Sequence, residues 1–297
     1  MSLIDEFVDH LRLEQISPDV FSGYSRFTAS KGHVFGGQVL GQAISAAGQT
    51  VADKLCHALS CQFLRGGNFD LPIEYRVTRV RDGKSFSARQ VSAWQNGKEL
   101  LRLEASFQVD AQGHTHQPRM PQVPLPETLP DMSFYKADFE ALDRMSMYRF
   151  LVEDNVFEFR ATDKPCYVET RNRPPVQQSW LRSRFSMPQD PRLQRAVLGY
   201  ISDNNFMRTA TLPHREELMR SGFQLATLNH SMWIHRTPNL NEWLLYDVHS
   251  SVACGQRGLV LGHMYTLDGA LVATVAQEGM IRPVDGNKAG LAFSEGN

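Results

Sequence analysis

Asp203 is the residue of this chain whose type and position point most directly to acid–base chemistry. It lies in the segment Gly-Tyr-Ile-Ser-Asp-Asn-Asn-Phe (199–206), near the end of a helix that we expect to be buried. Burial disfavours a charged carboxylate, so it raises the pKa of an aspartate toward the range in which the group works as a general base. A solvated aspartate at a frayed helix end is the alternative, and the local sequence leaves both interpretations open.

Other familiar catalytic patterns are absent from the sequence. There is no GxSxG nucleophile elbow, no GxxxxGK[ST] phosphate loop and no GxGxxG dinucleotide motif. The pairs His114/His116 and His230/His235 lack carboxylate or cysteine neighbours at metal-ligand spacing, so we expect no metal and no cofactor. His230 and His235 are five residues apart on a predicted strand. They should therefore face opposite sides of it, each as an ordinary half-buried histidine.

Two buried helices are expected to position the chemistry, one in each half of the chain. Residues 34–47 are small or apolar on nearly every side, which is typical of a helix enclosed by protein. Asp190 and Pro191 form an N-cap and first-turn pair for a second helix that continues to Asp203. An amphipathic helix is also predicted at residues 3–13, where apolar residues recur at helical spacing.

Strands accompany each central helix, and Asp-Gly or Asn-Gly pairs supply several of the hairpin turns. The predicted strands cover 59–64, 73–80, 86–94 and 100–109 in the first half, and 178–185, 224–235, 243–248, 259–266 and 271–276 in the second. Corresponding elements are offset by roughly 155 to 170 residues. This order predicts an α+β protein of two similar units, each an antiparallel sheet curled around a central helix.

A proline-rich stretch separates the two units. Five of the chain's 15 prolines fall within residues 118–130, where they exclude a helix or an interior strand and favour an extended linker. We therefore expect four parts: an N-terminal domain over 1–115, a linker and connecting segment over 116–150, a C-terminal domain over 151–285 and a tail over 286–297.

Composition excludes several classes of partner. The 297 residues carry 31 Lys and Arg against 32 Asp and Glu, a formal net charge of -1, so the chain has no positive field for nucleic acid or anionic lipid. No apolar run approaches the roughly 18 residues of a membrane span, and the N-terminus does not resemble a secretory signal. Four scattered cysteines without a CxxC pair are typical of a reducing compartment, and we expect a cytoplasmic protein.

Four motifs carry a resemblance to a known family. In chain order they are Phe-Gly-Gly-Gln-Val-Leu-Gly-Gln-Ala (35–43), Arg-Asp-Gly-Lys-Ser-Phe-Ser-Ala-Arg (81–89), His-Ser-Met-Trp (230–233) and Asn-Leu-Asn-Glu-Trp-Leu-Leu-Tyr (239–246). They resemble acyl-CoA thioesterase II, a family of bacterial medium- and long-chain thioesterases and their peroxisomal relatives, from about residue 5 to residue 283. The resemblance implies a tandem (double) hot-dog fold and hydrolysis of acyl-CoA to free fatty acid and CoA, without a metal or a covalent intermediate.

The same resemblance implies a catalytic trio. The aspartate of the family's Gly-Tyr-x-Ser-Asp motif is Asp203 here, its threonine is Thr227 in Ala-Thr-Leu, and its glutamine is Gln277 in Ala-Gln-Glu-Gly. The aspartate would take a proton from a water molecule, while the threonine and the glutamine would fix the orientation of that water. Asn229 departs from the family pattern, because several relatives carry Asp there, and it removes a negative charge close to Thr227.

Substrate binding has to rely on local features, because the net charge is near zero. We expect the amide of Gly37, or of a residue near Asp203, to hold the oxyanion of the reaction. Candidates for contact with the CoA phosphates are Arg65, Arg81, Lys84 and Arg89. A solvated strand face is the alternative role for most of these cations. The resemblance further implies a homodimer or homotetramer, for which open edge strands give a physical reason.

Two rival functions come from different classes. Hot-dog proteins include enoyl-CoA hydratases, whose motif resembles Asp-x-Asn-x-x-His, whereas residues 203–208 read Asp-Asn-Asn-Phe-Met-Arg. Arg208 cannot exchange a proton as histidine does, so it disfavours a hydratase. The second rival is a non-catalytic acyl-CoA binder. The N-terminal half fits that role because it has no acidic residue between Gly32 and Val51, and we expect one active site per chain, in the second unit.

Overall fold

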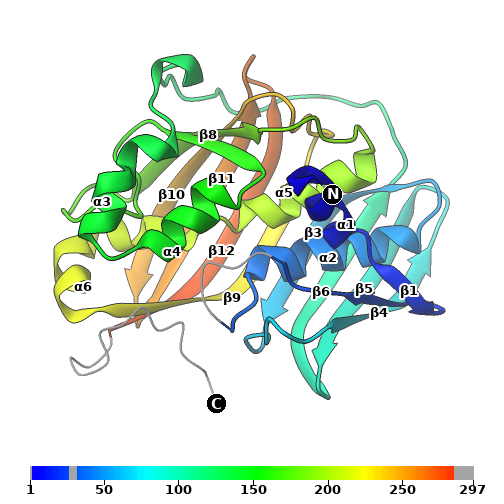
Figure 1. Cartoon of the computed structure of the whole chain (residues 1–297). Helices are drawn as coiled ribbons and strands as arrows, with labels where there is room; N and C mark the ends of the chain where they lie inside the picture. The colour runs from blue at the N-terminus through cyan, green and yellow to red at the C-terminus, as the bar shows by residue number, and fades with distance from the viewer. Residues whose placement is uncertain (1, 27–31, 284–297) are drawn as a thin grey trace.

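The two halves of the chain share one continuous antiparallel sheet (Figure 1). The structure is a computed structural model that describes residues 2–26 and 32–283, so the tail predicted over 286–297 lies outside the described residues. The first helix, α1 (Leu3–Leu11), begins at a capping box. In this box the Ser2 hydroxyl accepts a hydrogen bond from the Asp5 amide, and the Asp5 carboxylate accepts one from the Ser2 amide.

The N-terminal half wraps its strands around one helix, α2 (Gly36–Gln49). Nearly every residue of α2 from Gly37 to Ala47 is buried, as its small and apolar sequence predicts. The strands are β1 (Glu14–Ser17), β2 (Val20–Gly23), β3 (Leu55–Phe63), β4 (Ile73–Asp82), β5 (Phe86–Gln95) and β6 (Lys98–Gln108). Asn96 and Gly97 have φ values of 49° and 72°, which is the type I′ backbone expected of the Asn-Gly turn between β5 and β6.

The C-terminal half repeats this plan around α5 (Pro191–Ser202), whose N-cap Asp190 accepts a hydrogen bond from the Arg192 amide at 3.0 Å. Its strands are β7 (Phe157–Ala161), β8 (Val176–Ser183), β9 (Phe223–Ile234), β10 (Leu244–Cys254), β11 (Arg257–Thr266) and β12 (Leu271–Pro283). The predicted strand at 243–248 ends too early. The rest of β10 is largely exposed and lacks the alternating apolar pattern on which the prediction depends.

The strand order relates the two halves by a pseudo-two-fold axis. The sheet runs β1-β2-β4-β5-β6-β3-β9-β12-β11-β10-β8-β7, so each strand of one half has a counterpart at the same distance from the centre. At the centre β3 pairs with β9, and Ser60 lies opposite Ser231 with their hydroxyl oxygens 2.9 Å apart. The axis passes beside this pair and relates α2 to α5. The predicted repeat of one α+β unit is present, with both copies joined in one sheet.

The two central helices pack against each other inside the curved sheet (Figure 1). Gly37 lies beside Tyr200 and Gly41 lies beside Ala196, so α2 and α5 run in opposite directions. Glycine at position 199 helps this approach, because a Cβ there would lie 2.3 Å from the terminal side-chain carbon of Ile44 and would displace it. The N-terminus of α2 therefore meets the C-terminus of α5.

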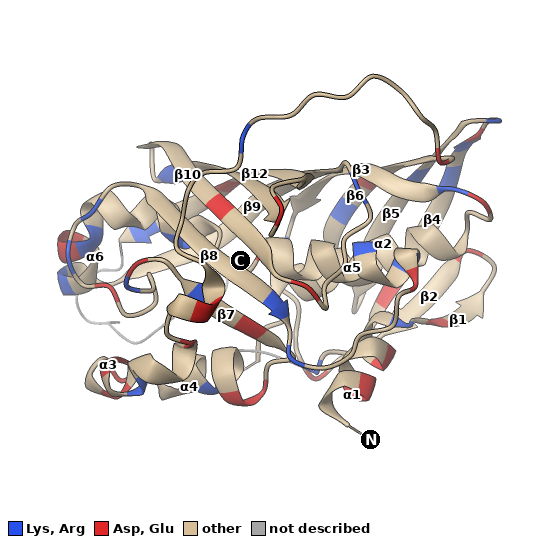
Figure 2. Ribbon diagram, turned by 90° about the horizontal axis from the view of Figure 1, so that it is seen from above, with Lys and Arg blue, Asp and Glu red and all other residues tan. Residues whose placement is uncertain are grey.

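Short helices fill the connections. Residues 109–125 form no helix or strand and cross the molecule as a long loop (Figure 2). After it come η1 (Pro126–Thr128), η2 (Met132–Tyr135), α3 (Lys136–Ala141), α4 (Met145–Tyr148) and the π-helix η3 (Arg149–Glu153). These elements build a second apolar cluster around Phe139 and Phe150. The helices η4 (Met207–His214) and α6 (Arg215–Ser221) follow α5.

The sequence does not predict the outermost strands β1, β2 and β7. They are four, four and five residues long, which leaves too few alternating positions for a periodic signal. Charged residues of both signs are interspersed over both halves (Figure 2). No helix among residues 2–26 and 32–283 is long and apolar enough to cross a membrane.

Candidate active site

The structure brings Asp203, Thr227 and Gln277 together, although they come from three separate elements. Gln277 Nε2 donates to Asp203 Oδ1 at 2.9 Å and to Thr227 Oγ1 at 2.7 Å. The Thr227 hydroxyl donates to Asp203 Oδ1 at 3.3 Å. The three side chains implied by the family resemblance thus form one hydrogen-bonded group, which we call the Asp203 cluster.

Asp203 is placed by the end of α5. It is the C-cap residue of that helix, and the chain turns away through Asn205, whose φ of 67° is a left-handed conformation that asparagine tolerates. Because the two central helices are antiparallel, this end lies beside Gly36 and Gly37 at the start of α2. A Cβ on Gly37 would lie 2.2 Å from the Tyr200 carbonyl oxygen, so the approach is possible only with glycine.

A β-bulge in β9 turns Thr227 toward Asp203. In the pairing of β9 with β12, β9 advances two residues, from Thr227 to Asn229, where β12 advances one, so Leu228 is an extra residue. In a regular strand, side chains three residues apart lie on opposite faces, which would separate Thr227 from His230. The extra residue places both on the inner face of the sheet.

His230 fixes the orientation of the Gln277 amide. Its Nδ1 lies 2.6 Å from Gln277 Oε1, and Nδ1 must carry the hydrogen because an amide oxygen can only accept. Gln277 is only 1% exposed, so this bond supplies its buried oxygen with a partner. With its oxygen held by His230, Gln277 presents its NH₂ group to Asp203 and Thr227.

Ser202 extends the network on the other side of the His230 ring. Burial lowers the pKa of His230 to about 4, so the ring is neutral and Nε2 has a free lone pair. The Ser202 hydroxyl lies 3.0 Å from this Nε2 and 2.8 Å from the Gly199 carbonyl oxygen, so one hydrogen serves two acceptors. The Tyr246 hydroxyl donates to the Ser202 carbonyl oxygen at 2.8 Å and ties this turn to β10.

The environment of Asp203 makes its carboxylate more basic. Burial raises its pKa from 3.8 to about 6, while hydrogen bonds from Gln277, Thr227 and the Gly37 amide act in the opposite direction by stabilising the charged form. The positive end of the α2 dipole also faces this group. Because Gln277 and Thr227 donate hydrogen bonds to this carboxylate, Asp203 is not a solvated residue at a frayed helix end.

In the structure the Gly37 amide donates a hydrogen bond to the Asp203 carboxylate. The oxyanion role expected of this amide from the sequence stays a prediction. Gly36 also borders the carboxylate, since a Cβ on it would lie 2.8 Å from Asp203 Oδ2. The start of α2 therefore belongs to the site through its backbone.

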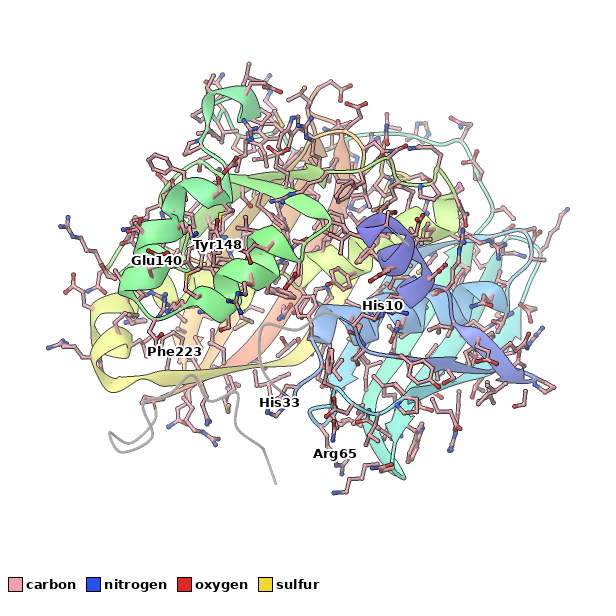
Figure 3. All side chains as sticks on the ribbon, in the orientation of Figure 1. His10, His33, Arg65, Glu140, Tyr148 and Phe223 are labelled. Carbon is pink, nitrogen blue, oxygen red and sulfur yellow. The ribbon has the colours of Figure 1, made fainter. Side chains whose placement is uncertain are left out.

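Arg65 lies at the end of the molecule that carries the start of α2 (Figure 3). It follows β3 and is exposed, and its Nη1 donates to the Glu99 carbonyl oxygen at 2.9 Å. The adjacent Gly66 faces His33, which precedes α2 in the sequence. Arg65 therefore lies at the same end of α2 as Asp203.

Arg81, Lys84 and Arg89 lie at the opposite end of α2. Arg89 is 2% exposed and donates to Thr50 Oγ1, at the C-cap of α2, and to the Asp82 carboxylate, at 2.8 and 2.7 Å. Arg81 and Lys84 are exposed on the adjoining turn. A helix of 14 residues spans about 20 Å, so these three cations do not adjoin Asp203.

Sequence reasoning missed the part that His230 plays. The expected half-buried histidine is fully buried and bonded to Gln277, while His235 is exposed, so only their opposite orientation is confirmed. A signal was present, since His230 lies in one of the four motifs that carry the resemblance and Ser202 lies in the family's Gly-Tyr-x-Ser-Asp motif. Asn229, where relatives carry Asp, accepts a hydrogen bond from the Glu278 amide at 3.1 Å. Among the described residues, no three His, Cys, Asp or Glu gather into a possible metal site.

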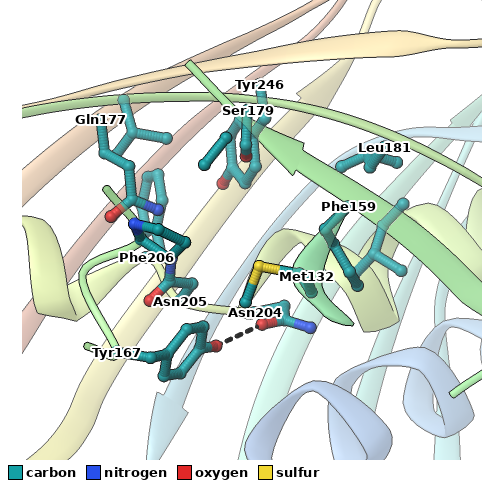
Figure 4. A pocket seen from close by; sticks show the side chains of 14 residues that line it. Met132, Phe159, Tyr167, Gln177, Ser179, Leu181, Asn204, Asn205, Phe206 and Tyr246 are labelled. Carbon is teal, nitrogen blue, oxygen red and sulfur yellow. Dashed lines mark hydrogen bonds between the residues drawn. The ribbon is translucent and has the colours of Figure 1, made fainter. Parts of the chain in front are cut away.

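An apolar pocket begins one residue beyond Asp203 (Figure 4). Asn204 and Phe206 line it from the segment after α5, with the Phe206 ring stacked on Tyr246 at 5.4 Å between centroids. The Tyr167 hydroxyl donates to Asn204 Oδ1 at 2.7 Å. The volume of about 30 Å³ corresponds to about one water molecule.

Known proteins are similar in sequence to both halves of the chain. Family models match residues 154–280, as acyl-CoA thioesterase, and residues 25–108, as acyl-CoA thioesterase N-terminal domain. Acyl-CoA thioesterase 2 of Haemophilus influenzae is 36% identical over 282 residues, covering 94% of this chain and 98% of that protein. Acyl-coenzyme A thioesterase 8 of Mus musculus is 36% identical over 92% of this chain and 87% of its own length.

Solved structures share the fold. Acyl-CoA thioesterase II TesB2 of Mycobacterium marinum matches with a TM-score of 0.76 and 33% identity, over 93% of this chain and 98% of that one. A protein with a hot dog fold from Alicyclobacillus acidocaldarius matches with a TM-score of 0.75 at 18% identity, which shows the fold alone. The tandem hot-dog fold implied by the sequence resemblance is confirmed. From these matches over both halves, the chain belongs to the acyl-CoA thioesterase family and is an acyl-CoA hydrolase.

Proposed function

We propose that this chain hydrolyses medium- to long-chain fatty acyl-CoA by direct attack of water, with Asp203 as the general base. The observation that supports this most strongly is the Asp203 cluster beside the N-terminus of α2. A buried carboxylate with a pKa of about 6 is ionised at neutral pH and still basic enough to accept a proton in the transition state.

The reaction needs one water molecule and no further reactant. The water oxygen bonds to the thioester carbonyl carbon while one of its hydrogens passes to the Asp203 carboxylate. The tetrahedral intermediate then expels the CoA thiolate as the C–S bond breaks, and this sulfur takes the proton back from Asp203. Thr227 and Gln277 hold the water and the carboxylate in the orientation that the attack requires.

In this proposal the start of α2 stabilises the oxyanion. As Asp203 accepts the proton, its negative charge disappears and a negative charge develops on the thioester oxygen. The Gly37 amide and the positive end of the α2 dipole can then act on that oxygen, because the neutral carboxyl holds the amide less strongly. Gly36 and Gly37 have no side chains to obstruct the substrate.

His230 acts in this mechanism as a positioning residue. A reversed Gln277 amide would turn its oxygen toward the Asp203 carboxylate and lose both N–H bonds. The hydrogen bond from His230 Nδ1 to Gln277 Oε1 opposes that reversal. The neutral ring keeps the same donor and acceptor throughout the range near neutral pH.

Arg208 argues against the hydratase alternative. Its guanidinium carbon lies 5.1 Å from the centroid of the Tyr167 ring, a cation–π contact that suits a permanent charge. A guanidinium is always protonated, so Arg208 cannot supply the second acid–base group that addition of water to a double bond requires.

We assign different roles to the predicted N-terminal and C-terminal domains. The C-terminal half supplies the Asp203 cluster, and the N-terminal half supplies the start of α2 and the CoA contact at Arg65. The apolar pocket beside Asp203 takes the acyl chain. Because its volume is now about 30 Å³, residues such as Met132 and Phe159 must move to admit a long chain.

The assembly that we propose is a homodimer or homotetramer formed through the outer strands of the sheet. All four residues of the edge strand β1 are exposed, so its outer backbone groups are available to a second copy. Light scattering coupled to size-exclusion chromatography decides the point, since a monomeric mass at micromolar concentration contradicts it.

Release of free thiol tests the reaction itself. Purified protein is incubated with acyl-CoA substrates of two to 18 carbons, roughly the range of common fatty acids, and the thiol is followed with a colorimetric reagent. We expect the highest kcat/KM for medium and long chains. No thiol from any substrate contradicts a thioesterase, and consumption of crotonyl-CoA without thiol release favours a hydratase.

A single turnover in ¹⁸O-labelled water tests the direct attack. If water attacks the thioester, the fatty acid carries the label and Asp203 remains unlabelled. An acyl-Asp203 intermediate would instead place ¹⁸O in the Asp203 carboxylate, which mass spectrometry of the corresponding peptide detects.

A further inference from the structure

The pseudo-two-fold axis maps the Asp203 cluster onto a second set of residues in the N-terminal half. Asp203 and Thr50 are the C-cap residues of the two related helices, α5 and α2. The bulge of β9 recurs in β3, which advances two residues, from Cys56 to Ala58, where β6 advances one. The counterparts of Asp203, Thr227, Gln277 and His230 are therefore Thr50, Cys56, Ala105 and Leu59. We call this region the counterpart site.

None of these counterpart residues can act as a general base on water at neutral pH. Thr50 accepts a hydrogen bond from Arg89, and Cys56 is buried with its pKa raised to about 12. Ala105 and Leu59 have no polar atoms in their side chains. The counterpart site has the same backbone arrangement as the Asp203 cluster but no side chain among these four that could act as a general base.

A cavity of about 330 Å³ nevertheless remains at the counterpart site, about ten times the volume of the pocket beside Asp203. It lies between α1, the C-terminal end of α2 and the start of α5. Cys56 and Phe107, which face each other across β3 and β6, form part of its wall. Its apolar wall is made of Leu11, Leu13, Ile44, Phe107 and Leu193.

Two arginines, Arg192 and Arg195, line the cavity. Arg195 is 8% exposed, and it donates to the Cys56 carbonyl oxygen at 2.6 Å and to Thr237 Oγ1 at 3.0 Å. Its Nε is buried without a hydrogen-bond partner. Arg192 donates to the carbonyl oxygens of Gly48 and Ala52. Within the described part of the chain, neither arginine forms an ion pair.

The acidic groups near the cavity either pair with other residues or act on the two arginines from a distance, as Asp110 does on Arg195 and Asp53 does on Arg192. Lys54 pairs with Asp53 at 2.8 Å, and Arg12 lies 3.9 Å from Asp9. The carboxylate of Asp190 is committed to the N-cap of α5. A buried guanidinium without a directly bonded counter-ion is costly, so an anion bound against Arg195 would offset that cost.

We propose that the counterpart site binds a fatty carboxylate, the acid product of the reaction, with its carboxylate against Arg195 and its chain along the apolar wall. A ligand with one negative charge and an apolar tail matches both parts of the cavity. The volume of about 330 Å³ lies at the lower end of the range for small-molecule sites, which suits a medium-length chain. The proposal does not depend on the catalytic role of Asp203.

Gly48 offers a variant that fills the cavity without disturbing the helix. It lines the cavity, and a Cβ added to it meets no atom within 4 Å. Gly48→Leu should occupy the space of the ligand, and Gly48→Ala is the matched control for the change in helix propensity. Arg195→Met removes the charge and keeps most of the side-chain volume. Arg215→Met is its control, because Arg215 is also buried and donates to two carbonyl oxygens but does not line the cavity.

Isothermal titration with decanoate gives the readout, with decanol and CoA as separate titrants. We expect Gly48→Leu to remove one bound decanoate per chain and Arg195→Met to weaken that binding by about 10-fold or more, the loss of a charge-assisted bond. Gly48→Ala and Arg215→Met should bind as wild type does. Gly48→Leu should leave kcat/KM for decanoyl-CoA unchanged, which separates this site from the Asp203 cluster.

Three results would overturn the proposal. The first is equal decanoate binding by wild type, Gly48→Leu and Arg195→Met, which would place the ligand elsewhere or nowhere. The second is decanol binding as tightly as decanoate, which would remove the role of the charge. The third is displacement of decanoate by CoA in wild type but not in Arg195→Met. That result would make a phosphate of CoA the true ligand.

Discussion

The two ends of the α2–α5 helix pair share one backbone arrangement but carry side chains of different chemical character. At one end a C-cap aspartate, a bulged strand and a glycine-rich helix start make the Asp203 cluster. At the other end the C-cap residue is Thr50, the bulged strand presents Cys56, and the helix start carries Pro191 and Arg192. In the mechanism that we propose, catalysis therefore depends on a few side chains placed on a framework that both ends share.

Asp203→Asn should give the largest difference in activity between changes at the two ends of the helix pair. It keeps the shape of the residue and removes the base, so kcat for decanoyl-CoA should fall by about 10² to 10⁴. Thr50→Ser, at the counterpart position, should leave kcat unchanged. Steady-state kinetics with free-thiol detection measures both, and full activity of Asp203→Asn would show that the aspartate is structural.

Two glycines of α2 allow the same comparison for stability. Gly37→Ala places a Cβ 2.2 Å from the Tyr200 carbonyl oxygen and should lower the free energy of unfolding by about 1–3 kcal/mol. Gly48→Ala meets open space and should raise it by about 0.5–1 kcal/mol. Urea unfolding of the two variants checks this, and effects of the same sign would contradict the contacts described at the start of α2.

His230→Leu introduces the residue that the counterpart site carries as Leu59. Gln277 Oε1 then loses its donor, and kcat should fall by about 10-fold with little change in KM, because the amide is no longer held. His230→Asn can place an N–H near the position of Nδ1 and should recover part of the loss. A rise in KM at unchanged kcat, or no recovery with Asn, would indicate that His230 only fills space.

The pH profile tests the environment of Asp203. The carboxyl must be ionised to act as a base, so kcat/KM should fall by about tenfold per pH unit below its pKa of about 6. His230, whose pKa is about 4, stays neutral over pH 5 to 8 and adds nothing to that slope. A flat profile between pH 5 and 7 would exclude a buried base of this kind.

The same raised pKa affects stability with a definite sign. The folded state binds the Asp203 proton more tightly than the unfolded state does, so this group's contribution to the free energy of unfolding decreases as pH rises from 3.8 to about 6. Asp203→Asn removes that dependence. Its melting temperature relative to wild type should therefore be higher at pH 7 than at pH 4.

Local sequence patterns predict the central helices and most strands but not the edges of the sheet. The run at 34–47 is small and apolar, and Asp190 with Pro191 marks a helix start, so α2 and α5 have signals within their own residues. The four-residue strand β1 is fully exposed and has none. Family motifs point to Asp203, whereas the local sequence left open whether its carboxylate is buried or solvated.

Contacts between distant segments account for the residues that the sequence misplaced. The burial of Arg89 depends on Thr50, which is 39 residues away in the chain. The contact of His230 with Gln277 depends on the pairing of β9 with β12 and on the bulge at Leu228. Nothing in the sequence around residue 228 marks an extra residue, so the face on which Thr227 lies could not be deduced.

The central pairing of β3 with β9 has a consequence for folding. Ser60 and Ser231 are 171 residues apart in the chain, so during synthesis the N-terminal half emerges with β3 as an unpaired edge. Pairings this distant in sequence form slowly, and exposed edges invite association with other chains. Until β9 has been translated, the first half therefore has to avoid aggregation with an open strand at what later becomes the middle of the protein.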